Sequence, residues 1–352
     1  MKVTKKVVGN LEKCYSLAML DYKHTRHFLV AAEKVNKCLL YDLEGELEET
    51  VWEQPGGVMS MVQVPGTDGQ FLATHQFYSP NDSAQAKIVI ATPKDRCGWE
   101  IRTLVNLPFV HRFDIFSKGG VNYLIACTLK SGHEYKDDWS MPGKIYAAVL
   151  PDDLGRFNGT DQLELTVICD NMPKNHGYYR YKRENGEGAV ISCERGEFLI
   201  TPPDTPDDSW NTVQLIGIPA SDAVLVDLDG CGEEELFVMS PFHGDTASIY
   251  KKHWGRYEKI YEYPEKAEFL HALYGGDIGG IPTVVVGHRK GARRLLAFRS
   301  DKMGSYKVQV LDQDTGAANV LHYKKNGMDI MIAANRETDE IAMYEFEEET
   351  CK

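Results

Sequence analysis

The sequence predicts an all-β protein, a seven-bladed β-propeller built from four-stranded blades. Three observations favour this class. Short apolar runs, some alternating and some continuous, recur along the chain and are separated by Gly, Asn and Asp, which is typical of strands. The runs come in sets of four, and the sets repeat about every fifty residues, the period of a propeller blade. The periodicity of amphipathic helices is nearly absent.

Two of the sets show the pattern well. One consists of VHRFDIF (110–116), VNYLIACT (121–128), KIYAAVL (144–150) and LELTVICD (163–170). Another consists of FLHALYGG (269–276), IPTVVVG (281–287), RRLLAFR (293–299) and YKVQVLD (306–312). Each run is short enough for one strand, so each set predicts one blade.

Seven such sets can be counted from the start of the first strand. We expect these starts near Cys14, Met59, His111, His176, Asp222, His271 and His322. The last set supplies only NVLHYKK, MDIMIAA and IAMYEF. The N-terminal KVTKKVV precedes the first set, so we expect it to close the last blade as its fourth strand, which would protect the sheet edge. Residues 1–352 are therefore predicted to form a single propeller domain.

Composition narrows the functional classes. The 352 residues are 43% hydrophobic and have a formal net charge of −13, which argues against nucleic acid as the partner. No apolar stretch follows the basic N-terminus, so we expect neither a signal peptide nor a membrane partner. The eight cysteines form no CxxC motif, and we expect free thiols in a cytoplasmic protein. A homodimer remains open.

A propeller gathers particular positions at one mouth of its central channel. The beginning of each first strand and the end of each second strand open on the same face, where loops tend to carry function. Seven of the eleven histidines fall at these two kinds of position. They are His75, His111, His176, His243, His271, His288 and His322.

Such a cluster points to a metal centre. Imidazole is the commonest ligand of transition metals in proteins, and three rings can form a site with an open position. We expect His176, His243, His271 and His322 to supply the ligands of a divalent ion, either Mn, Zn, Mg or Fe, with three of the four binding it. A metal-free cluster for acid–base chemistry and a purely structural role are the alternatives.

Two loops have distinct compositions. KSGHEYKDDWSMPG (130–143) follows the second strand of the third blade, and its Tyr135 and Trp139 suit the face of a sugar ring, although an ordinary surface loop is equally compatible. TPPDTPDDSW (201–210) is expected on the opposite face as a solvated loop.

VDLDGCGEEELFV (226–238) resembles the D-x-D-G-x-G-x-x-[DE] loop of FG-GAP/VCBS propellers. In that family the loop holds calcium through oxygen ligands. Asp227, Asp229 and Glu235 match ligand positions, but Cys231 occupies another of them and a thiol is a poor calcium ligand. The resemblance implies either a weak calcium site or a turn without an ion.

SPFHGDTASIYKK (240–252) resembles the F-H-G-N-T-x-S-V-Y segment in the propeller domain of aldos-2-ulose dehydratase, also called 1,5-anhydrofructose dehydratase. FVHR (109–112) is similar to the M-H-R strand start of that family. The family dehydrates a keto-sugar and isomerises the product with a bound divalent metal, and the resemblance implies a catalytic role for His111. Its members carry cupin domains after the propeller, which this sequence does not contain.

These observations lead us to expect a metal-dependent carbon–oxygen lyase that acts on a small carbohydrate. We expect His111 to be the base and His75 to be the acid in a β-elimination. The expected substrate contacts are Glu33, Arg112, Glu194, His288, Arg289 and Asn335, with Tyr135 and Trp139 above them. An oligosaccharide or polysaccharide uronate lyase and a non-catalytic carbohydrate-binding propeller are the alternatives.

Overall fold

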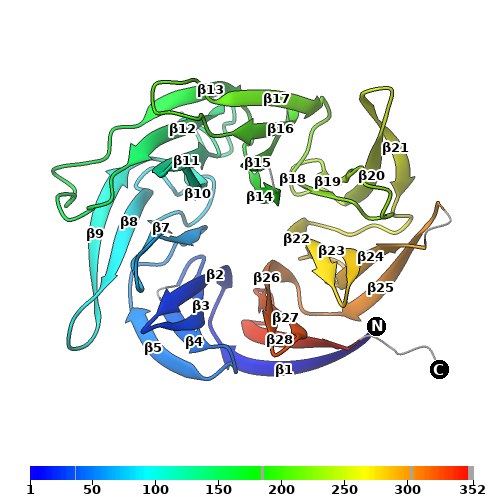
Figure 1. Cartoon of the computed structure of the whole chain (residues 1–352), viewed down its shortest axis with the longest axis horizontal. Helices are drawn as coiled ribbons and strands as arrows, with labels where there is room; N and C mark the ends of the chain where they lie inside the picture. The colour runs from blue at the N-terminus through cyan, green and yellow to red at the C-terminus, as the bar shows by residue number, and fades with distance from the viewer. Residues whose placement is uncertain (36, 184–185, 302–303, 348–352) are drawn as a thin grey trace. The chain divides into compact units, whose positions relative to one another are not determined.

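A computed structural model describes residues 1–35, 37–183, 186–301 and 304–347. Within these ranges the chain has 28 strands and no helix. The strands form seven antiparallel sheets of four strands each (Figure 1). The predicted class, an all-β chain with seven four-stranded blades, is confirmed. The described residues also contain no helix that is long and apolar enough to cross a bilayer.

The chain divides into two compact units. The first unit comprises Ser16–Ile218, and the second comprises Met1–Tyr15 together with Pro219–Lys352. Each unit contains whole sheets, apart from β2 (Cys14–Tyr22), whose first two residues belong to the second unit.

The first unit contains four sheets, each with its strands paired in chain order. The sheets are β2, β3 (Thr25–Ala32), β4 (Cys38–Asp42) and β5 (Leu47–Trp52); β6 (Met61–Gln63), β7 (Phe71–His75), β8 (Lys87–Pro93) and β9 (Trp99–Asn106); β10 (Val110–Lys118), β11 (Val121–Thr128), β12 (Gly143–Leu150) and β13 (Thr166–Met172); and β14 (Gly177–Arg183), β15 (Gly186–Cys193), β16 (Gly196–Thr201) and β17 (Asn211–Ile216).

The second unit contains the other three sheets. They are β18 (Asp222–Val226), β19 (Glu235–Ser240), β20 (Thr246–His253) and β21 (Arg256–Glu262); β22 (Leu270–Ile278), β23 (Ile281–His288), β24 (Leu295–Ser300) and β25 (Tyr306–Asp312); and β26 (Ala317–Lys325), β27 (Met328–Asn335) and β28 (Glu340–Glu347) with β1 (Lys2–Asn10).

The predicted closure by the N-terminus is confirmed. Strand β1 pairs antiparallel with β28, from Lys2 opposite Glu347 to Asn10 opposite Glu340. Figure 1 shows β1, in blue, beside the red β28. Met1 and Val3 pack against the hydrophobic core of this blade. The first and last strands of the chain therefore share one sheet.

Burial explains why the second strand of each blade has a continuous apolar run. The last six residues of both β3 and β11 are buried, as are the last seven of β27. Such strands have neighbouring strands on both edges and packed side chains on both faces, so alternation is lost. Core clusters join the facing surfaces of consecutive sheets, for example the sheets that begin with β10 and β14.

Some predicted boundaries differ from the structure by one to three residues, and one start is misplaced. Strand β6 begins at Met61 rather than Met59, and β13 begins at Thr166 rather than three residues earlier. His322 is the sixth residue of β26 and does not begin it. The loop 201–210 does connect β16 to β17, but its last residue, Trp210, is half-buried and packs on a core cluster instead of being solvated.

The cysteines behave largely as expected. Cys14, Cys38, Cys127 and Cys193 are buried free thiols, Cys169 is partly buried, and Cys97 and Cys231 are exposed. Burial raises the pKa of the Cys14 thiol to about 12, which makes it unreactive at neutral pH. Cys351 lies outside the described residues.

Candidate functional site

His111 and His271 occupy equivalent places in their sheets. In β10, Val110 pairs with Thr128 and Arg112 with Cys127, so the pairing skips His111. In β22, Leu270 pairs with His288 and Ala272 with Gly287, so the pairing skips His271. Both histidines thus sit at a register shift of the β-bulge kind, which turns a side chain away from its normal direction.

The two bulges use the same hydrogen bond. Nδ1 of His111 lies 3.2 Å from the carbonyl oxygen of His176, and Nδ1 of His271 lies 2.7 Å from that of Ala318. Each acceptor is near the start of the next blade's first strand. A carbonyl oxygen can only accept, so Nδ1 carries the hydrogen in both rings. Nε2 is therefore the basic nitrogen of each neutral ring, the state required of a metal ligand or a base.

The bulge position also corrects the placement of His322. In β26 the pairing skips Ala318, which is therefore the counterpart of His111 and His271. His322 lies four residues further along, where its Nε2 is 2.7 Å from Oδ1 of Asp329 and its Nδ1 is 3.1 Å from the Tyr274 hydroxyl. Both ring nitrogens are thus engaged, and nothing in these contacts supports a ligand role.

His243 lies in the tight turn after β19. Its backbone is left-handed, with φ of 51°, and the N–H of Gly244 donates to the carbonyl of Pro241 at 2.8 Å. A Cβ on Gly244 would lie 2.4 Å from Pro241, so only glycine fits there. The His243 ring stacks between Phe242 and Phe269, with centroid distances of 4.0 and 4.2 Å.

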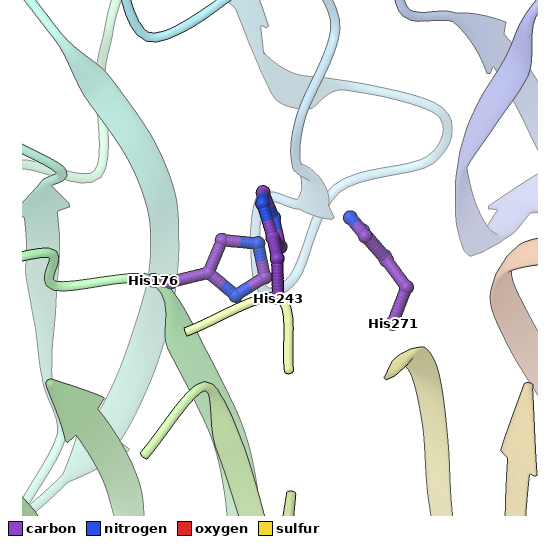
Figure 2. Close-up of side chains that lie close together, drawn as sticks. All are labelled: His176, His243 and His271. Carbon is purple, nitrogen blue, oxygen red and sulfur yellow. The ribbon is translucent and has the colours of Figure 1, made fainter. Parts of the chain in front are cut away.

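The second unit brings His243 and His271 together. Their rings are nearly parallel, at 24°, with centroids 5.7 Å apart (Figure 2). His271 is 2% exposed, whereas His243 is half-buried. The pair combines one imidazole oriented by a carbonyl with one held between two phenyl rings. Such fixed rings can bind an ion or a substrate with little loss of side-chain entropy.

Tyr15 is a site residue that the sequence reasoning missed. Its hydroxyl lies 3.0 Å from Nε2 of His271, and the two rings meet edge to face. Because Nδ1 of His271 carries the hydrogen, the phenol donates to Nε2. The amide of Asn319 donates to the Tyr15 carbonyl at 2.8 Å and fixes the backbone. The only sequence signal for this role was that Tyr15 directly follows Cys14, the predicted start of the first strand in the first blade.

His176 and His111 belong to the first unit. His176 directly precedes β14 and is 1% exposed, and its ring centroid lies 4.6 Å from that of His111. Phe77 contacts His111 edge to face at 5.1 Å. The position predicted for both residues, at the start of a first strand, is confirmed.

His75 ends β7 as predicted, but its environment does not suit an acid. The ring is 3% exposed and lies edge-on to Trp52 at 4.7 Å. Burial, assisted by the Lys87 ammonium, lowers the pKa of His75 to about 3. The imidazole therefore stays neutral at pH 7 and does not hold the extra proton of a general acid.

Several expected substrate contacts are occupied by the protein itself. Arg289 pairs with Glu337 at 2.9 Å, and the Arg112 guanidinium donates to the Met59 carbonyl at 2.7 Å. Glu194 forms an ion pair with Lys174. Arg289 and Glu194 are therefore paired with opposite charges, whereas Arg112 keeps its charge and is held by an uncharged carbonyl.

His288 and Asn335 end β23 and β27, as predicted, but both are structural. Nδ1 of His288 lies 2.9 Å from the Lys290 carbonyl, and its Nε2 accepts the Arg294 N–H at 3.0 Å. Asn335 is fully buried and donates to the Tyr344 hydroxyl at 3.2 Å. Glu33 follows β3 and is half-buried.

The loop 130–143 is organised around a buried lysine. Nζ of Lys130 donates to the Asn81 amide oxygen at 3.1 Å and to the Asp138 carbonyl at 3.2 Å. It also lies 4.9 Å from the centroid of the Trp139 ring. Trp139 thus covers the lysine, and Tyr135 is 68% exposed. Of the two aromatic residues predicted to face a sugar, Tyr135 is the more accessible.

An ammonium group fills the acidic loop after β18. Asp227, Asp229 and Cys231 have ligand-type atoms within 4.8 Å of one another. Nζ of Lys251 bonds to Asp229, to Sγ of Cys231 at 3.2 Å and to the buried Glu235 at 2.8 Å. Although burial lowers the pKa of Lys251, hydrogen bonds to Asp229 and Glu235 raise it overall. The lysine stays charged and supplies the positive charge that calcium would.

Comparisons with known proteins support the fold. No protein-family model matches the sequence, and no curated protein matches it. Among solved structures, the Dos1 propeller is 8% identical with a TM-score of 0.55, over 91% of this chain and 75% of that one. BBS1N in complex with ARL6DN, in crystals soaked with mercury or lead, is 10% and 11% identical with TM-scores of 0.57 and 0.59.

The two BBS1N structures are covered to 95% and 96% of their length, and this chain to 98% and 99%. Likenesses at such low identity show the fold alone. The fold is a β-propeller. The resemblances to FG-GAP/VCBS propellers and to aldos-2-ulose dehydratase stay predictions.

Proposed function

We propose that this protein is a divalent-metal-dependent carbon–oxygen lyase that eliminates a hydroxyl group from a keto-sugar. The observation that carries the proposal is the His243–His271 pair, with His271 oriented by the Ala318 carbonyl so that Nε2 is its basic nitrogen. When one ring nitrogen of a histidine binds a metal, the other nitrogen usually donates its N–H to a carbonyl or carboxylate.

The proposed ligand set is His176, His243 and His271, each of which offers one ring nitrogen. His176 precedes the first strand of the fourth blade, while His243 and His271 belong to the fifth and sixth. We expect the ring closure of a propeller to direct these positions to one mouth. Three imidazoles suit Zn, Mn or Fe and leave coordination positions open.

The reaction divides among three roles. A divalent ion, when bound, polarises a ketone oxygen and favours loss of the neighbouring proton. Nε2 of His111 is the base for that proton, because its Nδ1 hydrogen is committed to the His176 carbonyl. The C–H electron pair forms the new C=C bond as the C–O bond breaks. The Tyr15 hydroxyl protonates the departing oxygen, which leaves as water, and the proton on His111 returns to Tyr15 through solvent.

The charges support a neutral substrate over a uronate. Arg289 and Arg336 both pair with Glu337, at 2.9 and 2.8 Å, and the Arg112 guanidinium binds a backbone carbonyl. Arg195 donates to the Asn171 carbonyl at 3.1 Å. A uronate lyase needs a cation to bind the substrate carboxylate, and all four of these arginines already have partners within the fold. We therefore place the keto-sugar reaction first.

Metal analysis of the purified protein tests the ligand set. We expect close to one equivalent of a transition metal in the wild type, and a loss of most of it in His243→Ala and His271→Ala. His253→Ala is the matched control, because His253 is exposed at the end of β20. A wild-type protein without metal, even after incubation with Zn or Mn, would refute the proposed centre.

Turnover tests the reaction. We expect 1,5-anhydrofructose or a 3-keto-glucoside to give a conjugated product with ultraviolet absorbance, at a rate that falls by about a hundredfold or more in His111→Ala. Conversion of oligouronates but not of keto-sugars would replace this reaction with the uronate alternative.

A further inference from the structure

The first unit has a cavity whose lining includes none of the candidate-site residues. It has a volume of about 470 Å³ and is formed by β12, β13 and the loop between β16 and β17. The loop 201–210 connects the third strand of its sheet to the fourth, whereas the predicted channel mouth gathers connections between second and third strands. Successive strands run in opposite directions, so the cavity lies at the other end of the strands.

Two aromatic side chains form the back of the cavity. Trp210 and Tyr123 both line it, with their rings edge to face and centroids 6.0 Å apart. Tyr123 is 2% exposed, and its hydroxyl has no hydrogen-bond partner among the described residues. A buried hydroxyl without a partner is costly, so this group favours a bound polar ligand.

The loop that carries Trp210 is fixed in place. The Lys118 ammonium donates to the Pro202 carbonyl at 2.9 Å and pairs with Asp204 at 2.7 Å. The N–H and hydroxyl of Thr205 donate to Oδ2 of Asp208 at 3.2 and 2.9 Å. A pre-formed wall of this kind binds a ligand without a cost for ordering the loop.

Charge selects the class of ligand. Asp208 lines the cavity, and Asp204 and Asp207 belong to the same loop. The nearby Lys118 is already paired with Asp204, so it does not neutralise Asp208. An anionic ligand would be repelled. A ligand with hydroxyl groups for Asp208 and Tyr123 and an apolar face for Trp210 fits the wall, and a neutral sugar ring has both.

A second hollow borders the first at Val149. It has a volume of about 800 Å³ and shares Val149 with the cavity. Its wall includes Arg156, Gln162 and Glu164 from the loop between β12 and β13. The Val149 side chain, which is 44% exposed, lies where the two hollows meet. A chain of several sugar units could lie across it and occupy both hollows.

We propose that this cavity and the hollow beside it form a binding site for a neutral oligosaccharide, with one sugar ring against Trp210 and further units beyond Val149. The site is separate from the proposed lyase centre and needs none of its residues. Cavities of a few hundred Å³ with aromatic walls and a few polar groups are the usual form of small-ligand sites.

Titration calorimetry on the full-length protein tests this proposal. The probes are neutral gluco- and manno-oligosaccharides of one to six units, with oligogalacturonates as the anionic comparison. We expect one neutral series to bind, with at least about tenfold higher affinity for four units than for one. Trp210→Ala should weaken binding by about tenfold or more, as removal of an aromatic anchor usually does.

Val149→Arg provides a variant that does not disturb the core, because Val149 is exposed on a strand. We expect it to abolish the gain in affinity with chain length, while Val213→Arg, at a residue that is 45% exposed on β17, leaves binding unchanged. The proposal is overturned if no neutral series binds at about 10 mM. It is also overturned if oligogalacturonates bind better, or if both Trp210→Ala and Val149→Arg bind as the wild type does.

Discussion

At the scale of single residues, the hydrogen bonds of each ring separate histidines that look alike in the sequence. His271 and His111 each commit Nδ1 to a carbonyl, which leaves Nε2 as the basic nitrogen. His288 and His322 have both nitrogens engaged by neighbouring groups of the fold. All four histidines lie on first or second strands of their sheets, so this position alone does not show which ring has a nitrogen suited to bind a metal or accept a proton.

The Tyr15 hydroxyl leads to a prediction about metal affinity. In this structure the phenol donates to Nε2 of His271, the atom that the proposed ion would bind. Tyr15→Phe removes this competing hydrogen bond, which is worth about 1 kcal/mol, so we expect metal affinity to rise about fivefold. Loss of the acid should at the same time lower turnover by about a hundredfold.

The measurements for Tyr15→Phe are competition with a chromophoric chelator and steady-state kinetics. Tyr261→Phe is the control, because Tyr261 lies on β21, the last strand of its sheet, and has no role in the proposed site. Unchanged metal affinity in Tyr15→Phe would show that Nε2 of His271 is not a ligand atom.

His75 gives a prediction about stability and pH. Its folded pKa is about 3, against 6.5 for an ordinary histidine. As pH falls below 6.5, His75 becomes protonated in the unfolded chain but stays neutral in the folded protein. The free energy of unfolding therefore decreases as pH falls, until about pH 3. Between pH 7.5 and 5.0 this single group should cost about 2 kcal/mol in the free energy of unfolding.

Urea unfolding at the two pH values measures this cost. In His75→Gln the loss between pH 7.5 and 5.0 should be smaller by about 2 kcal/mol. His253→Gln, at an exposed histidine, should keep the wild-type dependence. Equal pH dependence in wild type and His75→Gln would contradict the prediction.

At the scale of elements, strands were predictable and bulges were not. VNYLIACT was expected as a strand over 121–128 and is β11 with those bounds. An apolar run is a local pattern, and it determines a strand whatever lies far away in the chain. The skipped position at Ala318 depends on how two strands pair, and no local signal separated it from His322.

The candidate site shows the same limit. His243 and His271 could be predicted as neighbours because the repeat places them at comparable ends of successive blades. The contact between Tyr15 and His271 joins residues 256 positions apart, and neither has an unusual sequence neighbourhood. Lys251 was missed for a similar reason, since β20 carries it to an acidic loop that precedes β19.

The acidic loop yields a prediction about calcium. Glu235 is fully buried and relies on Lys251, which also bonds to Asp229 and Cys231. Lys251→Met leaves these groups without their counter-charge, and removing one partner of a buried ion pair costs about 3 kcal/mol or more. We expect millimolar calcium to restore part of this stability in Lys251→Met and to leave the wild type unchanged.

Thermal unfolding with calcium, and with magnesium as the control ion, measures this effect. A wild-type protein stabilised by calcium would show that the ion displaces Lys251 and that the loop is a calcium site as it stands. Lys259→Met is a suitable control, because Lys259 pairs with Glu262 on the exposed strand β21.

At the scale of the whole molecule, the two ends of the described chain meet in one sheet. Strand β1 supplies the outer strand beside β28, and Val3 packs on the core that includes Ala342 and Tyr344. Removing residues 2–10 would expose the edge of β28 over its whole length. An exposed edge strand is a template for pairing with another chain.

We therefore expect the deletion of residues 2–10 to lower the free energy of unfolding by more than about 3 kcal/mol and to produce dimers or larger assemblies. A synthetic peptide with the sequence of residues 1–12 should restore the monomer when added in excess, because it can pair with β28 as β1 does. The same peptide with proline in place of both Lys5 and Lys6 should fail, since the N–H groups of adjacent residues face opposite edges of the strand and one of the two is therefore lost from the ladder with β28. Sedimentation velocity and urea unfolding measure both effects, and a deletion variant that stays monomeric with an unchanged unfolding midpoint would show that β28 does not need its outer neighbour.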